Sequence, residues 1–363
     1  TGDWDNAGGG MYVGATNSII DFIGTTTQSM DTGGTGNDND FYHLHHTGSS
    51  TLTVNNTDVD IDGDFFNTGG GAFVPNGQDL TVAGSWNNTA FADFTYGTST
   101  VTFDGTDQVI LGNTTFYNFT KMTGSAMLTF DADGEQVIAA DGLLELQGAG
   151  VGVYLTLRST VDGTQWGITL DEDGLQDIDF VDVKDSDATG DNVPGGAVDG
   201  RLLVGTANSV DSTNNDNWSF GNVTLTWEGD ISSDWNVAGN WNHGFIPTSG
   251  DSIIIPDISS CGTCVYPTLN LNVTIDDVTI NQGAKLTTDG FNITISDTLQ
   301  NAGNIIFSGS ESTVSIATVS TASAYDTGTF TYVGDDDGAQ DTFLIPLTIP
   351  NFQNVVIRDT NGG

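Results

Sequence analysis

The chain has 363 residues, and its 48 acidic side chains outnumber 6 basic ones, which gives a formal net charge of −42. Only five of the acids are glutamate; the rest are aspartate, which favours turns over helices, and 48 glycines favour turns as well. This composition excludes a helical bundle and a basic nucleic-acid binder, and a hydrophobic fraction of 37% excludes a disordered acidic tail. It is typical of an all-β, extracellular protein.

Short strand patterns recur in the first half of the chain. Val59 and Ile61 alternate with polar residues, and Leu80 and Val82 repeat the pattern 21 residues later. Gly, Asn or Asp closes each segment, and no helical pattern intervenes. Strands at this spacing predict the coils of a parallel β-solenoid, similar to a right-handed β-helix. The alternative is a row of tandem antiparallel β-sandwiches, whose strands recur every roughly 8–12 residues.

A longer repeat is superimposed on these segments. Trp4 and Trp86 each follow a Gly-x pair and are 82 residues apart, and Phe22 and Phe103 are 81 residues apart. We therefore predict internal repeats of about 80 residues, each about four segments long.

The pattern changes near residue 222. Residues 185–220 interrupt the strand segments, and a tryptophan-rich stretch follows before alternating segments return at Val273/Ile275 and Ile293/Ile295. We therefore predict two modules, residues 1–221 and 222–363, the second with a tryptophan-rich head. Its three tryptophans, Trp227, Trp235 and Trp241, are expected to pack as a cap over the first coil; the alternative is that they stack on sugars.

This head, with its Trp-x-Gly, Asn-Trp and Ile-Pro elements between Trp227 and Pro256, resembles the module heads of large secreted bacterial surface proteins. The Gly-x-Trp-x-Asn segments are similar to those of autotransporter-like and adhesin-like passengers. The resemblance implies a secreted protein of the bacterial cell surface, part of an adhesin, sheath or filament. It carries over no catalytic residues.

The sequence also predicts a mechanism for this structural role. No capping segment precedes the first coil or follows the last, so we expect either a longer chain or head-to-tail stacking of solenoid ends into a filament. No apolar run of about 18 residues exists, so no membrane insertion is expected. We predict that the chain is not an enzyme, because it has no Gly-x-Ser-x-Gly elbow and no phosphate loop. The alternative function is a polysaccharide-binding or polysaccharide-degrading β-helix.

Aspartates gather in the predicted turns. Ca²⁺ takes six to eight oxygen ligands from flexible loops, and six basic side chains cannot neutralise 48 acids. We therefore predict structural Ca²⁺, with two groups of candidate ligands: Asp182, Asp185, Asp187 and Asp191, and Asp335, Asp336 and Asp337. The alternating aspartates of residues 58–64 resemble an EF-hand loop, but Gly69 occupies the position of its last glutamate. We expect that run to be a solvated outer face.

The remaining candidates are cysteines and histidines. Cys261 and Cys264 form a CGTC segment, which we predict to be a disulfide that pins a loop; a redox dithiol and a zinc half-site without partners are the alternatives. His43 and His45 share a strand face. We expect a surface histidine pair, with Zn²⁺ or Cu²⁺ binding through a third ligand as the alternative.

Overall fold

The computed structural model describes residues 2–7, 12–13, 15–33, 39–89, 93–132, 134–191, 200–320, 327–334, 343 and 354–358. Among the described residues, 47% lie in strands and 1% in helices, and parallel sheets stack as a β-solenoid of about 13 turns. The predicted all-β solenoid is therefore confirmed, and the tandem sandwiches are excluded because the described strands pair in parallel. The chain divides into two units, Thr1–Gly221 and Asn222–Gly363.

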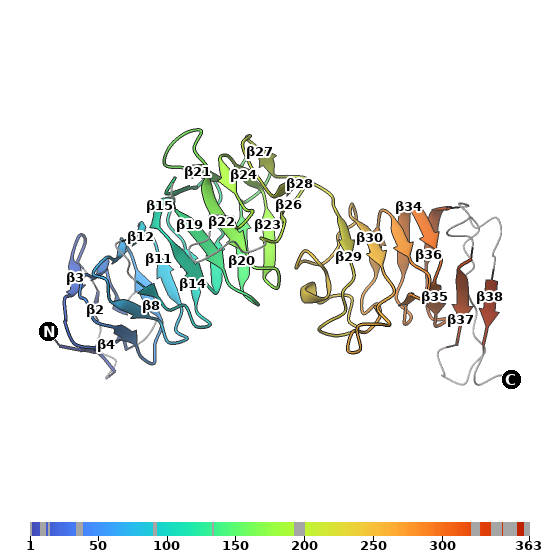
Figure 1. Cartoon of the computed structure of the whole chain (residues 1–363), viewed down its shortest axis with the longest axis horizontal. Helices are drawn as coiled ribbons and strands as arrows, with labels where there is room; N and C mark the ends of the chain where they lie inside the picture. The colour runs from blue at the N-terminus through green and yellow to red at the C-terminus, as the bar shows by residue number, and fades with distance from the viewer. Residues whose placement is uncertain are drawn as a thin grey trace. The chain divides into compact units, whose positions relative to one another are not determined.

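In unit 1 the described coils turn through three faces (Figure 1). The first face holds β1 (Trp4–Asp5), β4 (Gln28–Asp31), β7 (Leu52–Val54), β10 (Ala72–Val74) and β13 (Asp93–Phe94), and then β16 (Thr114–Phe116), β19 (Glu135–Ile138), β22 (Trp166–Leu170) and β25 (Ser186–Asp187). The second holds β8 (Val59–Ile61), β11 (Leu80–Val82), β14 (Thr100–Phe103), β17 (Asn118–Lys121), β20 (Leu143–Gln147) and β23 (Leu175–Asp179).

The third face is the longest continuous sheet. It holds β3 (Ile19–Phe22), β6 (His43–His46), β9 (Phe65–Asn67), β12 (Trp86–Asn88), β15 (Asp107–Gly112), β18 (Met127–Phe130), β21 (Leu155–Ser159), β24 (Val181–Val183) and β27 (Val210–Asp211). Two further strand pairs are β2 (Tyr12–Val13) with β5 (Asn39–Asp40), and β26 (Leu203–Gly205) with β28 (Trp218–Phe220).

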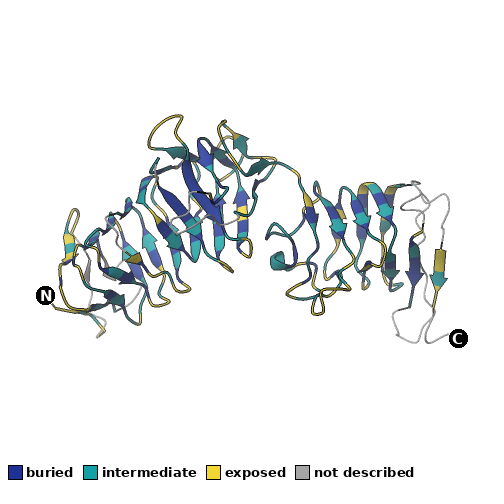
Figure 2. Cartoon of the chain, in the orientation of Figure 1, coloured by how far each residue is buried: buried dark blue, intermediate teal, exposed yellow. Residues whose placement is uncertain are grey.

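Each coil stacks its apolar side chains on those of the next. Val59 pairs with Leu80, and Ile61 with Val82, as the 21-residue spacing predicts. All four side chains are buried, while the turns between strands are largely exposed (Figure 2). Alternation places every second side chain inside. Because most of these side chains are apolar, stacking produces a continuous core with few buried polar groups.

The 80-residue repeat is not a structural period. Trp4 lies on the first face, paired with Met30, whereas Trp86 lies on the third face, paired with Phe65 and Ile110. The repeating unit is the single coil. Coil length varies, because insertions at the corners leave the stacked strands in place, so a spacing of several coils does not return the chain to the same face.

Unit 2 has a shorter stack of coils. One of its sheets contains β29 (Thr224–Thr226), β30 (Ser252–Ile255), β32 (Val278–Ile280), β34 (Ile293–Asn301), β31 (Val273–Ile275) and β36 (Val314–Val319). The other contains β33 (Lys285–Thr287), β35 (Asn304–Phe307), β37 (Thr329–Tyr332) and β38 (Asn354–Ile357). A single 3-10 turn, η1 (Ala238–Asn240), lies in the head among the described residues.

The three head tryptophans are packed, as predicted. Trp227, Trp235 and Trp241 are each at most 1% exposed, and the Trp241 ring lies 5.0 Å from that of Trp227 and 4.8 Å from that of Trp235. Buried rings cannot offer a stacking face to a sugar, so the tryptophans form part of the core of unit 2.

Candidate functional site

Aspartate side chains connect successive coils at the corners. Asp58 Oδ1 accepts a hydrogen bond of 2.9 Å from the amide of Asp79, and Asp79 Oδ1 accepts one of 2.7 Å from the amide of Thr100. In unit 2, Asp277 Oδ1 accepts one of 2.8 Å from Thr298. A short carboxylate reaches the next strand, about 4.8 Å away, and caps a backbone donor that the ladder leaves free. Much of the acidity therefore serves the stack itself.

The run of alternating aspartates follows this rule and does not form an EF-hand loop. Val59 and Ile61 point into the core, at 1% and 0% exposure. Asp58 caps a neighbouring coil, while Asp62 is exposed to solvent. The run is a strand face, as we expected.

Two of the predicted calcium ligands, Asp182 and Asp185, lie beside basic side chains. Asp182 binds Arg158 at 2.9 Å. Asp185 is buried and lies 3.7 Å from Lys184 Nζ. Burial alone would raise the pKa of Asp185, but hydrogen bonds from Gly163 and Asn214, together with the Lys184 charge, bring the pKa below its usual range. Two of these carboxylates thus already face basic side chains, which removes the charge argument for Ca²⁺ there.

The other predicted calcium ligands are Asp187, Asp191 and the three aspartates of residues 335–337. Asp187 Oδ1 accepts two hydrogen bonds from Thr189, at 2.9 and 2.6 Å, and Asp191 is exposed. Asp335, Asp336 and Asp337 lie outside the described residues. Calcium binding by any of these aspartates stays a prediction.

The histidine pair faces outward on β6, as predicted. The rings of His43 and His45 lie 6.1 Å apart, and His43 Nδ1 accepts the amide hydrogen of Asp64 at 2.9 Å. Burial is the main cause that lowers the pKa of His45. Within the described residues no third metal ligand joins these two histidines. The next residue, His46, points inward and contacts Asn67 Oδ1 at 2.8 Å.

A polar cleft surrounds Glu135, which sequence reasoning missed. The cleft measures about 370 Å³ and is lined by Asn113, Ala132, Gly134, Glu135, Thr164, Gln165 and Gly167. Glu135 is 4% exposed, and its Oε1 accepts a 2.7 Å hydrogen bond from Thr169. A Cβ on Gly167 would come within 1.7 Å of Oε2, so any other residue there would displace the carboxylate from this position.

The carboxyl group of Glu135 titrates near neutrality. Burial raises its pKa to about 7; the Thr169 hydrogen bond opposes that rise, and the charge of Asp187 adds to it. No pattern in the sequence singles out Glu135, because its strand position is outward and only the neighbouring coils cover it.

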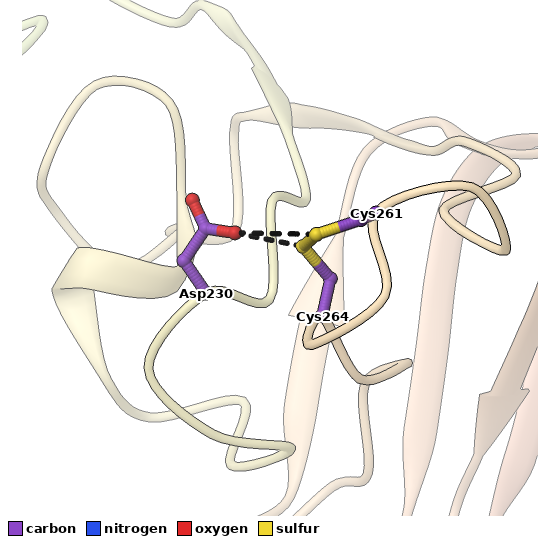
Figure 3. Close-up of side chains that lie close together, drawn as sticks. All are labelled: Asp230, Cys261 and Cys264. Atoms are coloured by element: carbon purple, nitrogen blue, oxygen red, sulfur yellow. Dashed lines mark hydrogen bonds between the residues drawn. A yellow bond between two sulfur atoms is a disulfide. The ribbon is translucent and has the colours of Figure 1, made fainter.

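The predicted disulfide between Cys261 and Cys264 is present, with 5.6 Å between the two Cα atoms. It lies in the head of unit 2 beside Asp230, a residue more than thirty positions earlier in the chain (Figure 3). Asp230 Oδ1 lies 2.8 Å from Cys264 Sγ and 4.0 Å from Cys261 Sγ. Among the described residues this is the single group of three side chains with metal-ligand spacing.

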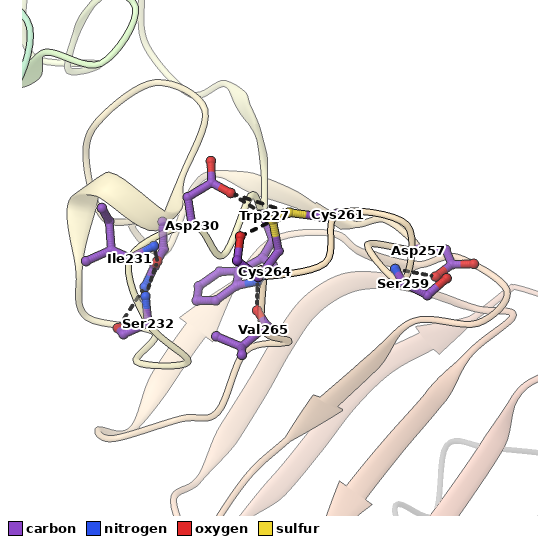
Figure 4. Close-up of a disulfide and its surroundings, with 11 residues drawn as sticks. Trp227, Asp230, Ile231, Ser232, Asp257, Ser259, Cys261, Cys264 and Val265 are labelled. Atoms are coloured by element: carbon purple, nitrogen blue, oxygen red, sulfur yellow. Dashed lines mark hydrogen bonds between the residues drawn. A yellow bond between two sulfur atoms is a disulfide. The ribbon is translucent and has the colours of Figure 1, made fainter.

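Hydrogen bonds to the backbone of Val265 hold the Asp230 loop against the cysteine loop (Figure 4). The buried Trp227 indole donates to the carbonyl of Val265 at 2.8 Å, and the amide of Val265 donates to Gly229 at 3.1 Å. Gly229 has a φ of +71°, and a Cβ there would lie 2.2 Å from the Val265 carbonyl. Glycine is therefore required for the two loops to approach each other.

The other side of the Asp230 loop is also anchored. Asn240, which is fully buried, accepts hydrogen bonds from the amides of Ile231 and Ser232 at 3.1 and 3.0 Å. Asp230 thus lies between two fixed segments, and its carboxylate stays beside the sulfur atoms. The sequence showed the two cysteines, but the third member of the group depends on this long-range packing.

Comparison with known proteins adds one match. A family model described as a domain of unknown function, DUF8693, matches residues 226–334, which include Asp230 and both cysteines. No curated protein and no solved structure matches the chain. Within the described residues, no helix has the length and apolar character needed to cross a membrane.

Proposed function

We propose that this chain is an extracellular structural protein of the bacterial cell surface, a subunit or segment of a filament, sheath or adhesin. Its coils would stack head to tail with those of a second copy. The observation that carries the proposal is the exposure of core rows at the outermost described strands.

The exposed row in unit 2 lies on β38. Phe307 stacks on Tyr332, and Tyr332 on Ile357, so the three side chains form one inward row. Phe307 and Tyr332 are 1% exposed, but Ile357 is 63% exposed because no described strand pairs with the outer edge of β38. An open parallel edge with an apolar row can accept a further coil.

The outermost strands of unit 1 have a corresponding row. Ile20 on β3 pairs with Leu44, which pairs with Phe65, and the outer edge of β3 has no described partner. Leu44 and Phe65 are fully buried, whereas Ile20 is half-buried. A repeated heterologous contact between two such edges would produce a filament where the rotation between copies does not close into a ring.

Electron microscopy and light scattering of the purified chain test this proposal. We expect elongated assemblies whose size increases with salt, because salt screens the repulsion between chains of charge −42. Ile357→Lys should shorten the assemblies. Val151→Lys, at a 75% exposed turn position away from the edge strands, is the matched control. A wild-type chain that stays monomeric at every salt and protein concentration contradicts the proposal.

A polysaccharide-degrading β-helix is the second candidate, and the Glu135 cleft is the observation that favours it. A carboxyl group with a pKa near 7 can act as a general acid, and Asp187 lies on the same ladder of residues, with Gly167 between them. Release of reducing ends from a polysaccharide panel measures this activity. Glu135→Gln should abolish it while the surface control Glu145→Gln should not; absence of activity in the wild-type chain excludes this candidate.

A further inference from the structure

The group formed by Asp230, Cys261 and Cys264 has a chemistry that a disulfide alone does not explain. Neither sulfur of a disulfide carries a hydrogen, so the Asp230 carboxylate receives no hydrogen bond from the cysteines while the bond is closed. The loops nevertheless hold the carboxylate 2.8 Å from Cys264 Sγ. This arrangement becomes a set of three anionic ligands once the disulfide opens.

We propose that this group is a redox-gated site for a thiophilic divalent cation such as Zn²⁺. The disulfide is the closed form. A dithiol reductant opens it: the S–S bond breaks, both cysteines gain an electron and a proton, and the reductant forms its own disulfide. Zn²⁺ then displaces the two thiol protons and is held by two thiolates and one carboxylate oxygen, with the fourth position left to water.

The ligand atoms have suitable spacing for such an ion. They all lie within 4.8 Å of one another. In a tetrahedral site with Zn–S bonds of about 2.3 Å, two sulfurs lie about 3.8 Å apart. The Cα atoms of the cysteines are 5.6 Å apart and lie in an exposed loop, so side-chain rotation can separate the sulfurs without a change in the strands.

Electrostatics couples the cation to the redox state. Two thiolates beside a carboxylate repel one another, so without a cation the reduced cysteines stay protonated. A divalent ion removes that repulsion and stabilises the reduced form. The overall charge of −42 raises the local concentration of cations around the exposed site.

Cobalt spectroscopy of the full chain tests the proposal. The protein is reduced with a phosphine, which becomes its oxide with oxygen from water, and is then desalted without air. Co²⁺ should bind reduced protein at one ion per chain with a thiolate-to-cobalt charge-transfer band, and Zn²⁺ should displace it. Oxidised protein should show no such band. Binding of Co²⁺ to surface carboxylates alone does not produce this band, so it is distinguished from the proposed site.

Two variants separate the carboxylate from general surface charge. Asp230→Asn should weaken Co²⁺ binding at least about tenfold. Asp234→Asn makes the same charge change at an exposed residue of the same head and should leave the affinity unchanged. The proposal is overturned if reduced wild-type protein shows no charge-transfer band, or if the two variants bind Co²⁺ equally well. Neither outcome depends on whether the chain forms filaments.

Discussion

The two units build the same fold from different cores. In unit 1 aromatic rings follow one another through the coils: Phe65 and Trp86 lie 4.3 Å apart, Trp86 and Phe116 5.4 Å, and Phe116 and Phe119 5.1 Å. In unit 2 the first described coils are filled mainly by Ile, Leu and Val, and the tryptophans gather in the head. A solenoid thus requires inward alternation and stacking, and both aromatic and aliphatic side chains can fill its coils.

Both units bury asparagine side chains, in partly different settings. Unit 1 carries an amide ladder inside its third face, where Asn67 Nδ2 donates to Asn88 Oδ1 at 2.8 Å and Asn88 donates to the carbonyl of Asn113 at 2.9 Å. In unit 2 the buried Asn301 makes the same kind of bond, donating to the carbonyl of Thr329 at 3.2 Å, and the head adds the loops anchored by Asn240. In both units these buried amides pair with backbone groups that would otherwise lack a hydrogen-bond partner.

The largest effect on stability is expected when one buried tryptophan in each unit is replaced by alanine. Trp86→Ala removes a fully buried ring in the middle of the aromatic core and should cost about 3–5 kcal/mol of unfolding free energy. Trp241→Ala should cost a similar amount but act on the head, since each coil contacts only its neighbours.

Hydrogen exchange with mass spectrometry distinguishes the two effects. Trp86→Ala should increase exchange in coils on both sides of β12, and Trp241→Ala mainly in residues 224–241. Equal loss of protection throughout both units in either variant would show that the whole chain unfolds as one cooperative unit. That result would contradict the expectation that each substitution acts on its own unit.

The second difference concerns one buried glutamate in each unit. The raised pKa of Glu135, about 7, means that the folded chain favours the protonated acid. Protonated Glu135 therefore makes its full contribution to the free energy of unfolding below about pH 4.5, and this contribution is lost as the pH rises through about 7. Glu135→Gln should stabilise unit 1 at pH 8 by up to about 3 kcal/mol and have little effect at pH 4.5.

Glu311 of unit 2 should respond in the opposite direction. Burial opposes its ionisation, but hydrogen bonds from Thr288, Ser308 and Gly309 outweigh burial and lower its pKa. Its contribution is present above its ordinary pKa and is lost as the pH falls through the lowered value. Glu311→Gln should therefore destabilise unit 2 at pH 7 and lose that effect in acid. Denaturant melts between about pH 3 and about pH 8 measure both variants, and equal pH profiles would contradict the assignment.

The smallest effect is expected from the corner aspartates, which the units share. Asp64 Oδ1 accepts the amide hydrogen of Ser85 at 2.7 Å, as Asp277 does for Thr298. Alanine at either position should cost about 1 kcal/mol, because one backbone donor loses its partner. Asp64→Asn keeps an oxygen acceptor and serves as the control in denaturant melts. An alanine variant as stable as wild type would mean that water replaces the carboxylate.

The sequence by itself determined the strands and their inward residues. Alternation at Val59/Ile61 and again at Leu80/Val82 is a local property, and the 21-residue spacing equals one coil, so both the fold class and the stacked pairs could be predicted. The disulfide could also be predicted, because a pair of cysteines three residues apart favours a local disulfide in an oxidising compartment.

Only the tertiary structure decided which face each segment occupies and which distant residues meet. Trp4 and Trp86 share a motif but not a face, since corners of variable length rotate the coil register. Glu135 is buried by its neighbouring coils, and Asp230 reaches Cys264 because Gly229 and Val265 bring two loops together. Such contacts depend on the sum of many loop lengths, which a local pattern does not encode.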